Sequence, residues 1–379
     1  MLLLNQYYQF FLTSPFIKND FMYRVIGMMS GTSMDGVDLA YCEFEEQKGK
    51  WSFEIKYAET IPYPEVWKTR LSKLDEQPIF LYPKTDAFYG KYIGQLINDF
   101  IEKNNLSVDL ISSHGHTIFH QPQNGFTAQI GSGAAIYAET NIPVVCDFRS
   151  VDVALGGQGA PLVPLGDTML FKEYDACLNL GGFANISFSK NEAINAFDIC
   201  PCNIVLNHIA EWMNLPFDDK GKIASSGIVN ANLLEELNAI GFYKMEGSKS
   251  LGKEWVNENV WPVMKKYDSL NNEDLMATFT EHIATQISDK INASKTSNIL
   301  ATGGGVFNQF LLSRIENKSS SKIAVPSANI INYKEALIFA FLGLLNMLNR
   351  NNIISSVTGA KQNSIGGAFY GSKVQPQNL

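Results

Sequence analysis

Hydrophobic positions in the first 150 residues form short strand-like runs, followed by segments with helical spacing. Residues 23–60 read as successive strands, and residues 63–104 are mainly helical in pattern. Within this helical part, residues 86–101 place apolar side chains at helix spacing. Residues 110–113 and 143–147 are short apolar runs that predict two more strands. The first part of the chain is therefore predicted to be α/β.

The same pattern recurs in the second half of the chain. Strand-like residues 176–178 precede helical patterns at residues 204–240 and 273–293. Residues 334–345 are apolar on nearly every face of a helix, which predicts a buried helix. Strand groups followed by helices thus occur twice, although the two halves share little residue identity. This arrangement suits two related α/β halves with a cleft between them.

A polar turn with two glycines and two aspartates separates the first two predicted strands. Glycines there would let backbone N–H groups face an anion without a Cβ in the way. The hydroxyl side chains add donors, and the aspartates could hold a hydrated Mg²⁺. Taken alone, the turn is better explained as an ordinary Gly/Asp hairpin. The residues that would bind a nucleotide here are Gly31, Thr32, Ser33, Met34, Asp35, Gly36, Val37 and Asp38.

Two further glycine turns follow strand-like runs later in the chain. The first lies within residues 179–185, between two strand-like runs, and the second lies within residues 301–308 and leads into a helical segment. Two hairpin phosphate loops plus a late strand-to-helix turn are the layout of the actin–hexokinase–Hsp70 kinase fold. In that fold the loops grip phosphates from both sides of a cleft, and the late turn holds the nucleoside. The glycines concerned are Gly181, Gly182, Gly303, Gly304 and Gly305.

The order and spacing of these motifs give the chain a specific family resemblance. From about residue 23 to residue 370, it resembles the anhydro-N-acetylmuramic acid kinases of bacterial cell-wall recycling. Each motif alone is common, but together in this order they are a strong signal. The matching segments are residues 31–38, 113–115, 147–149 with Asp152, 156–164, 179–185, 197–198, 303–305 and 356–360.

The resemblance implies a two-domain, actin-like ATPase fold of the ribonuclease H-like type, with the active site in the interdomain cleft. Domain I is predicted to comprise residues 22–149 and 340–379, and domain II residues 150–339. Residues 1–21 lack the positively charged start and the clean apolar core of a signal peptide. Their apolar patches are also too short and interrupted to span a membrane. We therefore expect residues 1–21 to form a weakly packed N-terminal extension.

The resemblance also assigns chemistry to particular residues. It implies ATP and Mg²⁺ as cofactors, an amino-sugar substrate, and Asp198 as the catalytic base. The base would take a proton from water attacking the anomeric carbon, and the freed O6 would then attack the γ-phosphate. Asp35 would hold Mg²⁺ through water. The predicted substrate-binding residues are Arg149, Gly157, Gln158 and Glu335.

Other interpretations of these residues remain open from the sequence. Asp198 could merely cap the turn before Pro201, and Arg149 could form an interdomain ion pair instead of binding the lactyl carboxylate of the substrate. Glu335 could be a helix N-terminal charge favoured by the helix dipole.

Two clusters of metal-binding residue types also need an interpretation. Cys200 and Cys202 stand where the family usually has glycines, so a positive φ there would be strained. They could suggest a metal site, but no second Cys pair accompanies them. His114, His116 and His120 could share one face of a strand. The family usually has Gln in place of His116, and structural or substrate-adjacent histidines are the favoured interpretation.

Composition sets limits on function. The 379 residues are 45% hydrophobic and 18% charged, which is typical of a soluble globular protein. A net charge of −8 argues against broad nucleic-acid binding. Five cysteines, an odd number mostly in apolar runs, predict reduced thiols and a cytoplasmic location. No membrane partner is expected. A homodimer remains open, because the sequence does not set the oligomeric state.

Two alternatives to the anhydro-sugar kinase follow from the sequence. A kinase of another amino sugar is made plausible by the cysteines that replace glycines beside Asp198. A sensor that binds nucleotide and sugar without turnover belongs to a different class. The candidate base and both phosphate loops argue against the sensor.

Overall fold

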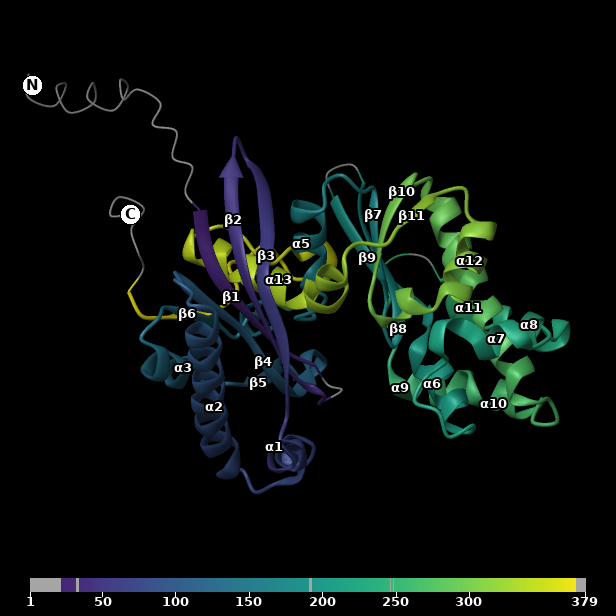
Figure 1. Ribbon diagram of the computed structural model, residues 1–379, viewed down its shortest axis with the longest axis horizontal. Coiled ribbons are helices and arrows are strands. Elements are labelled where there is room, and N and C mark those ends of the chain that lie inside the picture. The colour runs from purple at the N-terminus through teal and green to yellow at the C-terminus, as the bar shows by residue number, and fades with distance from the viewer. Residues whose placement is uncertain (1–21, 32–33, 191–192, 246, 248, 373–379) are drawn as a thin grey trace, which may run out of the picture.

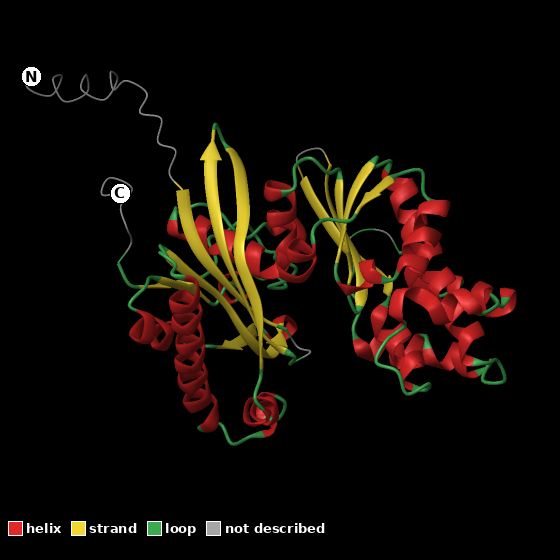
Figure 2. Cartoon of the chain, viewed as in Figure 1, coloured by secondary structure: helices red, strands yellow, loops and turns green. Residues whose placement is uncertain are grey.

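The computed structural model describes residues 22–31, 34–190, 193–245, 247 and 249–372 (Figures 1 and 2). The predicted extension at residues 1–21 lies outside the described residues, as do Thr32 and Ser33 of the first glycine turn. The described chain forms two β-sheets, each accompanied by its own helices (Figure 2).

The first sheet carries the first glycine turn. Its strands lie in the order β12-β6-β4-β1-β2-β3, and β5 pairs with β4. β1, β2 and β3 are antiparallel neighbours, whereas β1, β4 and β6 are parallel. The bounds are β1 (Met22–Ser30), β2 (Gly36–Gln47), β3 (Lys50–Pro62), β4 (Leu110–Gln121), β5 (Phe126–Ile130), β6 (Val144–Cys146) and β12 (Ala368–Tyr370).

The second sheet repeats the part of this topology formed by β3, β2, β1, β4 and β6. Its strands lie in the order β11-β10-β7-β8-β9, again with three antiparallel strands followed by parallel ones. The repeated order and strand directions confirm the prediction of two related α/β halves of the ribonuclease H-like type. The bounds are β7 (Ala176–Leu180), β8 (Phe183–Lys190), β9 (Ala193–Pro201), β10 (Asn298–Thr302) and β11 (Lys322–Ala324).

Helices cover both sheets, and those of the second half form the cluster on the right of Figure 1. The long helix α11 begins at an N-cap, because the Asn271 side chain accepts a hydrogen bond from Asp274 N at 2.7 Å. The helices are α1 (Glu65–Leu71), α2 (Leu81–Asn104), α3 (Gly133–Thr140), α4 (Ser150–Ala154), α5 (Val163–Leu170), α6 (Asn203–Glu211), α7 (Lys222–Ser226), α8 (Ala231–Asn238), α9 (Lys253–Asn259), α10 (Trp261–Lys265), α11 (Asn272–Ser294), α12 (Gln309–Lys318), α13 (Ala328–Met347) and α14 (Ser355–Thr358).

Helix α13 confirms the predicted buried helix and lies against β1, β2 and β4. The approach is close, since a Cβ on Gly27 of β1 would lie 1.9 Å from the Ala336 carbonyl oxygen. By length and composition α13 could cross a membrane, but 72% of its most apolar window is buried inside the protein. That burial is typical of a core helix.

The core joins the two halves at α5 and α13. One buried cluster contains Phe44 and Val25 of the first sheet together with Cys177 and Leu300 of the second. Helix α13 also runs unbroken through residue 340, where the predicted domain boundary falls. The division into domains stays a prediction, and the contacts of α13 favour assigning the whole helix to the first domain.

Candidate active site

The first glycine turn begins at a buried hydrogen-bonded network. Ser30, the last residue of β1, lies 2.7 Å from the Tyr63 hydroxyl and 2.8 Å from His116 Nδ1. Burial lowers the pKa of His116 to about 4, so the ring is neutral near pH 7. Within the turn, Met34 N donates to Gly31 O at 3.3 Å, and Met34 has φ +56°. The network fixes the strand end from which the turn starts.

Two carboxylates follow this turn. Asp38 Oδ1 accepts a hydrogen bond from Thr60 at 2.6 Å. Burial raises the pKa of Asp38, the Thr60 hydrogen bond lowers it, and the nearby Asp35 charge raises it again. Asp35 is exposed. Asp35 and Asp38 offer carboxylate oxygens, which are the ligands that a hard divalent cation prefers, so these residues fit Mg²⁺.

The second and third glycine turns pack against each other. Gly303 has φ +83°, and a Cβ there would lie 2.6 Å from Asn179 Oδ1. A Cβ on Gly305 would lie 2.7 Å from Leu180 Cβ. Only glycine therefore permits this contact between the β7–β8 turn and the turn after β10.

The start of α6 completes this arrangement. Asn203 Nδ2 donates to Leu180 O at 3.1 Å, and Asn203 N donates to Gly181 O at the same distance. Cys202 N donates to Gly182 O at 2.8 Å. A Cβ on Gly182 would have Ile204 Cβ as its nearest neighbour, at 3.9 Å, so this glycine faces open space.

A cavity of about 610 Å³ opens beside the third turn, lined by Asn203 of α6 and by Gly304 and Gly305. Phe217 and Phe307 also line it, and they are 55% and 50% exposed, respectively. Large aromatic side chains left open to solvent in a cavity provide flat surfaces for stacking a ring. Two of the predicted nucleotide-binding glycines, Gly304 and Gly305, thus line this cavity, and the sequence analysis assigned no role to either phenylalanine.

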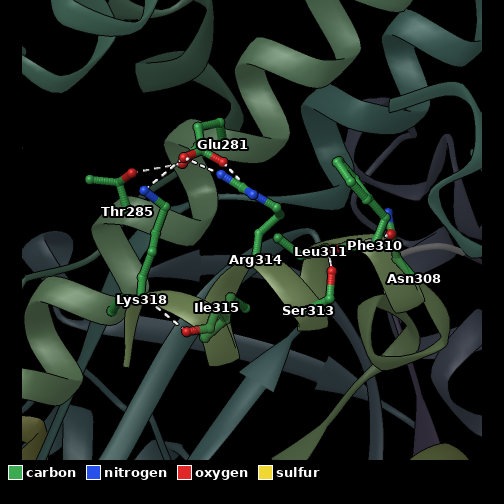
Figure 3. Close-up of polar contacts among 10 residues, drawn as sticks. Glu281, Thr285, Asn308, Phe310, Leu311, Ser313, Arg314, Ile315 and Lys318 are labelled. Atoms are coloured by element: carbon green, nitrogen blue, oxygen red, sulfur yellow. Dashed lines mark hydrogen bonds and ion pairs between the residues drawn. The ribbon is translucent and has the colours of Figure 1, made fainter. Parts of the chain in front are cut away.

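The helix after the third turn is held by a charge cluster (Figure 3). Glu281 of α11 accepts hydrogen bonds from Arg314 Nε at 2.7 Å and Nη2 at 2.9 Å, and it pairs with Lys318 at 2.7 Å. Both cations belong to α12, whose N-cap Asn308 accepts from Leu311 N at 2.9 Å. The bidentate contact anchors α12, and with it the third turn, on α11.

Asp198 lies on β9, opposite Asn185 of β8. Its backbone N–H donates to Lys249 O at 2.9 Å, and its Oδ2 accepts from Leu251 N at 2.7 Å. Burial raises the pKa of the Asp198 carboxyl, and the Leu251 N–H partly offsets that rise. Oδ1 accepts no hydrogen bond from the part of the chain that the structure describes. One carboxylate oxygen is thus held in place while the other stays available.

The residues predicted to bind substrate lie around a second polar group. Arg149 donates through Nη1 to Gly159 O at 2.6 Å, and its Nε lies 3.1 Å from His114 Nε2. Burial lowers the pKa of His114 to about 3 and the pKa of Arg149 to about 10. Neutral His114 therefore accepts from the guanidinium, and within the described residues Arg149 forms no ion pair within 4.0 Å.

The Gly156–Pro161 segment is fixed by a buried carboxylate that the sequence analysis did not assign. Asp152 is fully buried and accepts hydrogen bonds from Gly159 N at 2.7 Å and from the Thr358 hydroxyl at 2.6 Å. A Cβ on Gly157 would lie 2.2 Å from Asp152 Oδ2. The neighbouring Gln158 side chain is exposed, so it is presented to solvent by a rigid backbone.

The Glu335 side chain is exposed to solvent. Because the charges of Arg149 and Asp38 both act on it, we infer that these three residues face one recess. Burial raises its pKa, the charges of Lys334 and Arg149 lower it, and the Asp38 charge raises it. The structure therefore brings Glu335 near both Arg149 and Asp38. Asp198 has its hydrogen bonds within the second half of the chain.

The Cys and His clusters show separate structural roles. Cys200 and Cys202 are fully buried in the core of the second half, and neither is among the residues with positive φ. The replacement of the family's glycines by these cysteines therefore does not place a Cβ-bearing residue at a positive φ. His114 binds Arg149, whereas His120 is exposed and lies 3.1 Å from the Thr127 hydroxyl. Within the described residues, no group of three or more His, Cys, Asp or Glu could hold a metal ion.

Two sheets that share one order of five strands, each with a glycine turn between its first two strands along the chain, define a protein of the actin-like ATPase class. Residues 23–372 match the family model described as "Anhydro-N-acetylmuramic acid kinase". The chain therefore belongs to the anhydro-N-acetylmuramic acid kinase family.

Curated relatives agree with this assignment. The protein of that name from Sulfurimonas denitrificans is 33% identical, over 91% of this chain and 98% of the relative. The one from Shewanella frigidimarina is 34% identical, over 91% and 97%. A solved glucokinase from Streptomyces griseus is similar at a TM-score of only 0.40 and 10% identity, covering 85% of this chain and 99% of that one.

Proposed function

We propose that this chain is an ATP-dependent kinase that opens 1,6-anhydro-N-acetylmuramic acid with water and phosphorylates O6. The product would be N-acetylmuramic acid 6-phosphate, made in cell-wall recycling. The observation that carries the proposal is the Asp198 carboxylate, with Oδ2 held by Leu251 N–H and Oδ1 available. Family membership supplies the reaction, and this carboxylate supplies a group that can accept a proton.

In the proposed reaction, Asp198 accepts a proton from water as the water oxygen bonds to the anomeric carbon. The bond between that carbon and O6 breaks, and O6 then bonds to the γ-phosphorus while ADP leaves. The raised pKa of Asp198 makes its carboxylate a stronger base than that of an exposed aspartate. Base catalysis of this kind contributes a rate factor on the order of 10²–10⁴.

We place the nucleoside in the cavity beside the third turn, with the base against Phe217 and Phe307. The phosphates would extend past Gly182, whose missing side chain leaves room for them, toward the first turn. Asp35 and Asp38 would hold Mg²⁺, Asp35 through water, and the ion would neutralise charge on the phosphates.

For the sugar, we assign Arg149 to the lactyl carboxylate. Its guanidinium lies in the recess without a carboxylate within 4.0 Å among the described residues, so an anionic substrate would complete its coordination. Glu335 and the rigid 156–160 segment, with Gly157 and Gln158, would hold the sugar hydroxyl and acetamido groups. Cytoplasmic location and a homodimer remain predictions.

The test is turnover of purified protein with ATP and the anhydro sugar, followed by ADP release and by mass spectrometry of the sugar product. We expect a sugar phosphate heavier than the anhydro sugar by one water and one phosphoryl group. Turnover only with N-acetylglucosamine or N-acetylmannosamine would instead assign another amino sugar. Binding of both ligands without ADP release would indicate a sensor.

A further inference from the structure

A buried ion pair lies where the two halves of the protein meet. Lys334 Nζ of α13 is 3.1 Å from Asp167 Oδ1 of α5, and the two residues are only 4% and 6% exposed. The other carboxylate oxygen, Oδ2, accepts a hydrogen bond from the Ser187 hydroxyl of β8 at 2.6 Å. One carboxylate therefore bonds to a helix on the first sheet and to a strand of the second.

The elements around this pair pack too closely to slide. Helix α5 contacts β3 of the first sheet, β8 and β9 of the second sheet, and α13. A Cβ on Gly166 would lie 2.6 Å from Ile338 Cγ2, so α5 and α13 approach closely beside the ion pair. Apolar side chains such as Leu165 and Leu170 belong to the same cluster. A shift of α13 against the second sheet would separate Lys334 from Asp167 in a site with little access to water.

Stability alone does not explain a pair of this kind. Desolvating two charges costs about as much as their attraction returns, and an apolar pair of similar volume often stabilises a protein equally well. What the pair adds is a fixed geometry, because the charge and the hydrogen bonds are satisfied in one arrangement only. That geometry applies directly to the neighbouring residue, Glu335, which faces the recess.

We propose that Lys334 and Asp167, with Ser187, are positioning residues that hold Glu335 at a fixed place relative to the second half of the protein. The charge of Lys334 also favours the ionised form of Glu335. Lys334 and Asp167 touch neither substrate and act through Glu335. The inference rests on the proposed function, in which Glu335 binds the sugar.

The test begins with the wild-type enzyme. If it does not turn over the anhydro sugar, the proposed function is wrong, and that result does not test the role of the ion pair. The double variant Asp167→Asn/Lys334→Met removes both charges at nearly constant volume, so it avoids a buried unpaired charge. We expect it to fold, with the sugar KM raised or kcat lowered on the order of tenfold and the ATP KM unchanged. The control Glu46→Gln/Arg350→Met removes a 2.8 Å ion pair away from the recess. It should leave the sugar KM, kcat and the ATP KM unchanged.

A second measurement separates positioning from general support of the fold. If the pair acts through Glu335, the double variant made in a Glu335→Gln background should cause no further loss. The proposal would be overturned if the losses caused by the double variant and by Glu335→Gln multiplied when combined. Wild-type kinetics in the double variant would overturn it as well. Should the double variant not fold, Ser187→Ala, which keeps both charges, takes its place in the same comparison. It should show a smaller loss in the sugar kinetics alone, and that loss should vanish in the Glu335→Gln background.

Discussion

Leu251 N donates to Asp198 Oδ2 at 2.7 Å, while the Asp198 backbone N–H donates to Lys249 O at 2.9 Å. The 249–251 segment therefore holds both the backbone and the side chain of Asp198. Lys249 is itself anchored, because its Nζ donates to Phe242 O at 2.8 Å and lies 4.3 Å from the centre of the Phe242 ring. A carboxylate held this way keeps one orientation, and its Oδ1, which accepts no hydrogen bond from the described residues, can take part in proton transfer.

Replacing the base tests its role with little change in shape. Asp198→Asn keeps the size of the side chain but cannot accept the proton from the attacking water. We expect kcat to fall by on the order of 10²–10⁴. Dissociation constants for ATP and the sugar, measured by calorimetry, should change far less, since the loss lies in the transition state. Near-normal turnover would move the role of base to Glu335, the next carboxylate facing the recess.

The pH dependence should show an acid limb set by Asp198. Burial raises its pKa, so the base becomes protonated, and activity is lost, as the pH falls through a value above the usual 3.8. The measurement is kcat/KM for the anhydro sugar at saturating ATP, from about pH 4 to about pH 8. This interval covers the pH values at which an Asp with a raised pKa titrates. The limb should disappear from the residual activity of Asp198→Asn. A limb that persists in that variant belongs to another group.

The second glycine turn should tolerate a side chain structurally but not functionally. In Gly182→Val the new side chain meets open space, so folding should be preserved while the path of the phosphates is blocked. We expect the KM for ATP to rise on the order of tenfold or more, which corresponds to a loss of about 1.4 kcal/mol in binding free energy. The matched control is Gly241→Val, because a Cβ on Gly241 would have no atoms within 4 Å and Gly241 lies outside the proposed site. An unchanged ATP KM in Gly182→Val would place the phosphates elsewhere.

The nucleoside cavity has its own test. Phe217→Ala and Phe307→Ala should each weaken ATP binding by about 0.5–1.5 kcal/mol if both rings contact the base. The sugar KM at saturating ATP should stay the same. Phe88→Ala is the control, because Phe88 is 49% exposed on a surface groove between α1 and α2. Equal ATP affinity in all three variants would show that the adenine base does not bind in this cavity.

The sequence predicted the elements that depend on local patterns. The buried helix 334–345 lies within α13, and the repeated strand groups form two sheets that share one order of five strands. The turns at Gly182 and Gly303 were identified because a glycine-rich turn between apolar runs is visible within ten residues or so of sequence. The packing of these two turns against one another could not be predicted, because it depends on how β7 and β10 pair.

What the sequence did not reveal depends on contacts between distant segments. Phe217 and Phe307 have no local signal, and they line one cavity only because the segment after α6 and the third turn are neighbours in the fold. Asp167 and Lys334 likewise read as ordinary charged residues of two helices, and their burial follows from the packing of α5 on α13. Cys200 could be interpreted as a strained replacement for glycine until the backbone showed it in the core.

The most direct test of the account is the reaction in water labelled with ¹⁸O, stopped early and analysed by mass spectrometry. Ring opening by water predicts one solvent oxygen at C1 of the N-acetylmuramic acid 6-phosphate and none in the transferred phosphoryl group, because O6 of the sugar attacks the phosphorus. The unlabelled phosphate product transferred to labelled water serves as the control for exchange at C1. A sugar phosphate without solvent oxygen at C1, or an anhydro ring left closed, would contradict the proposed role of Asp198.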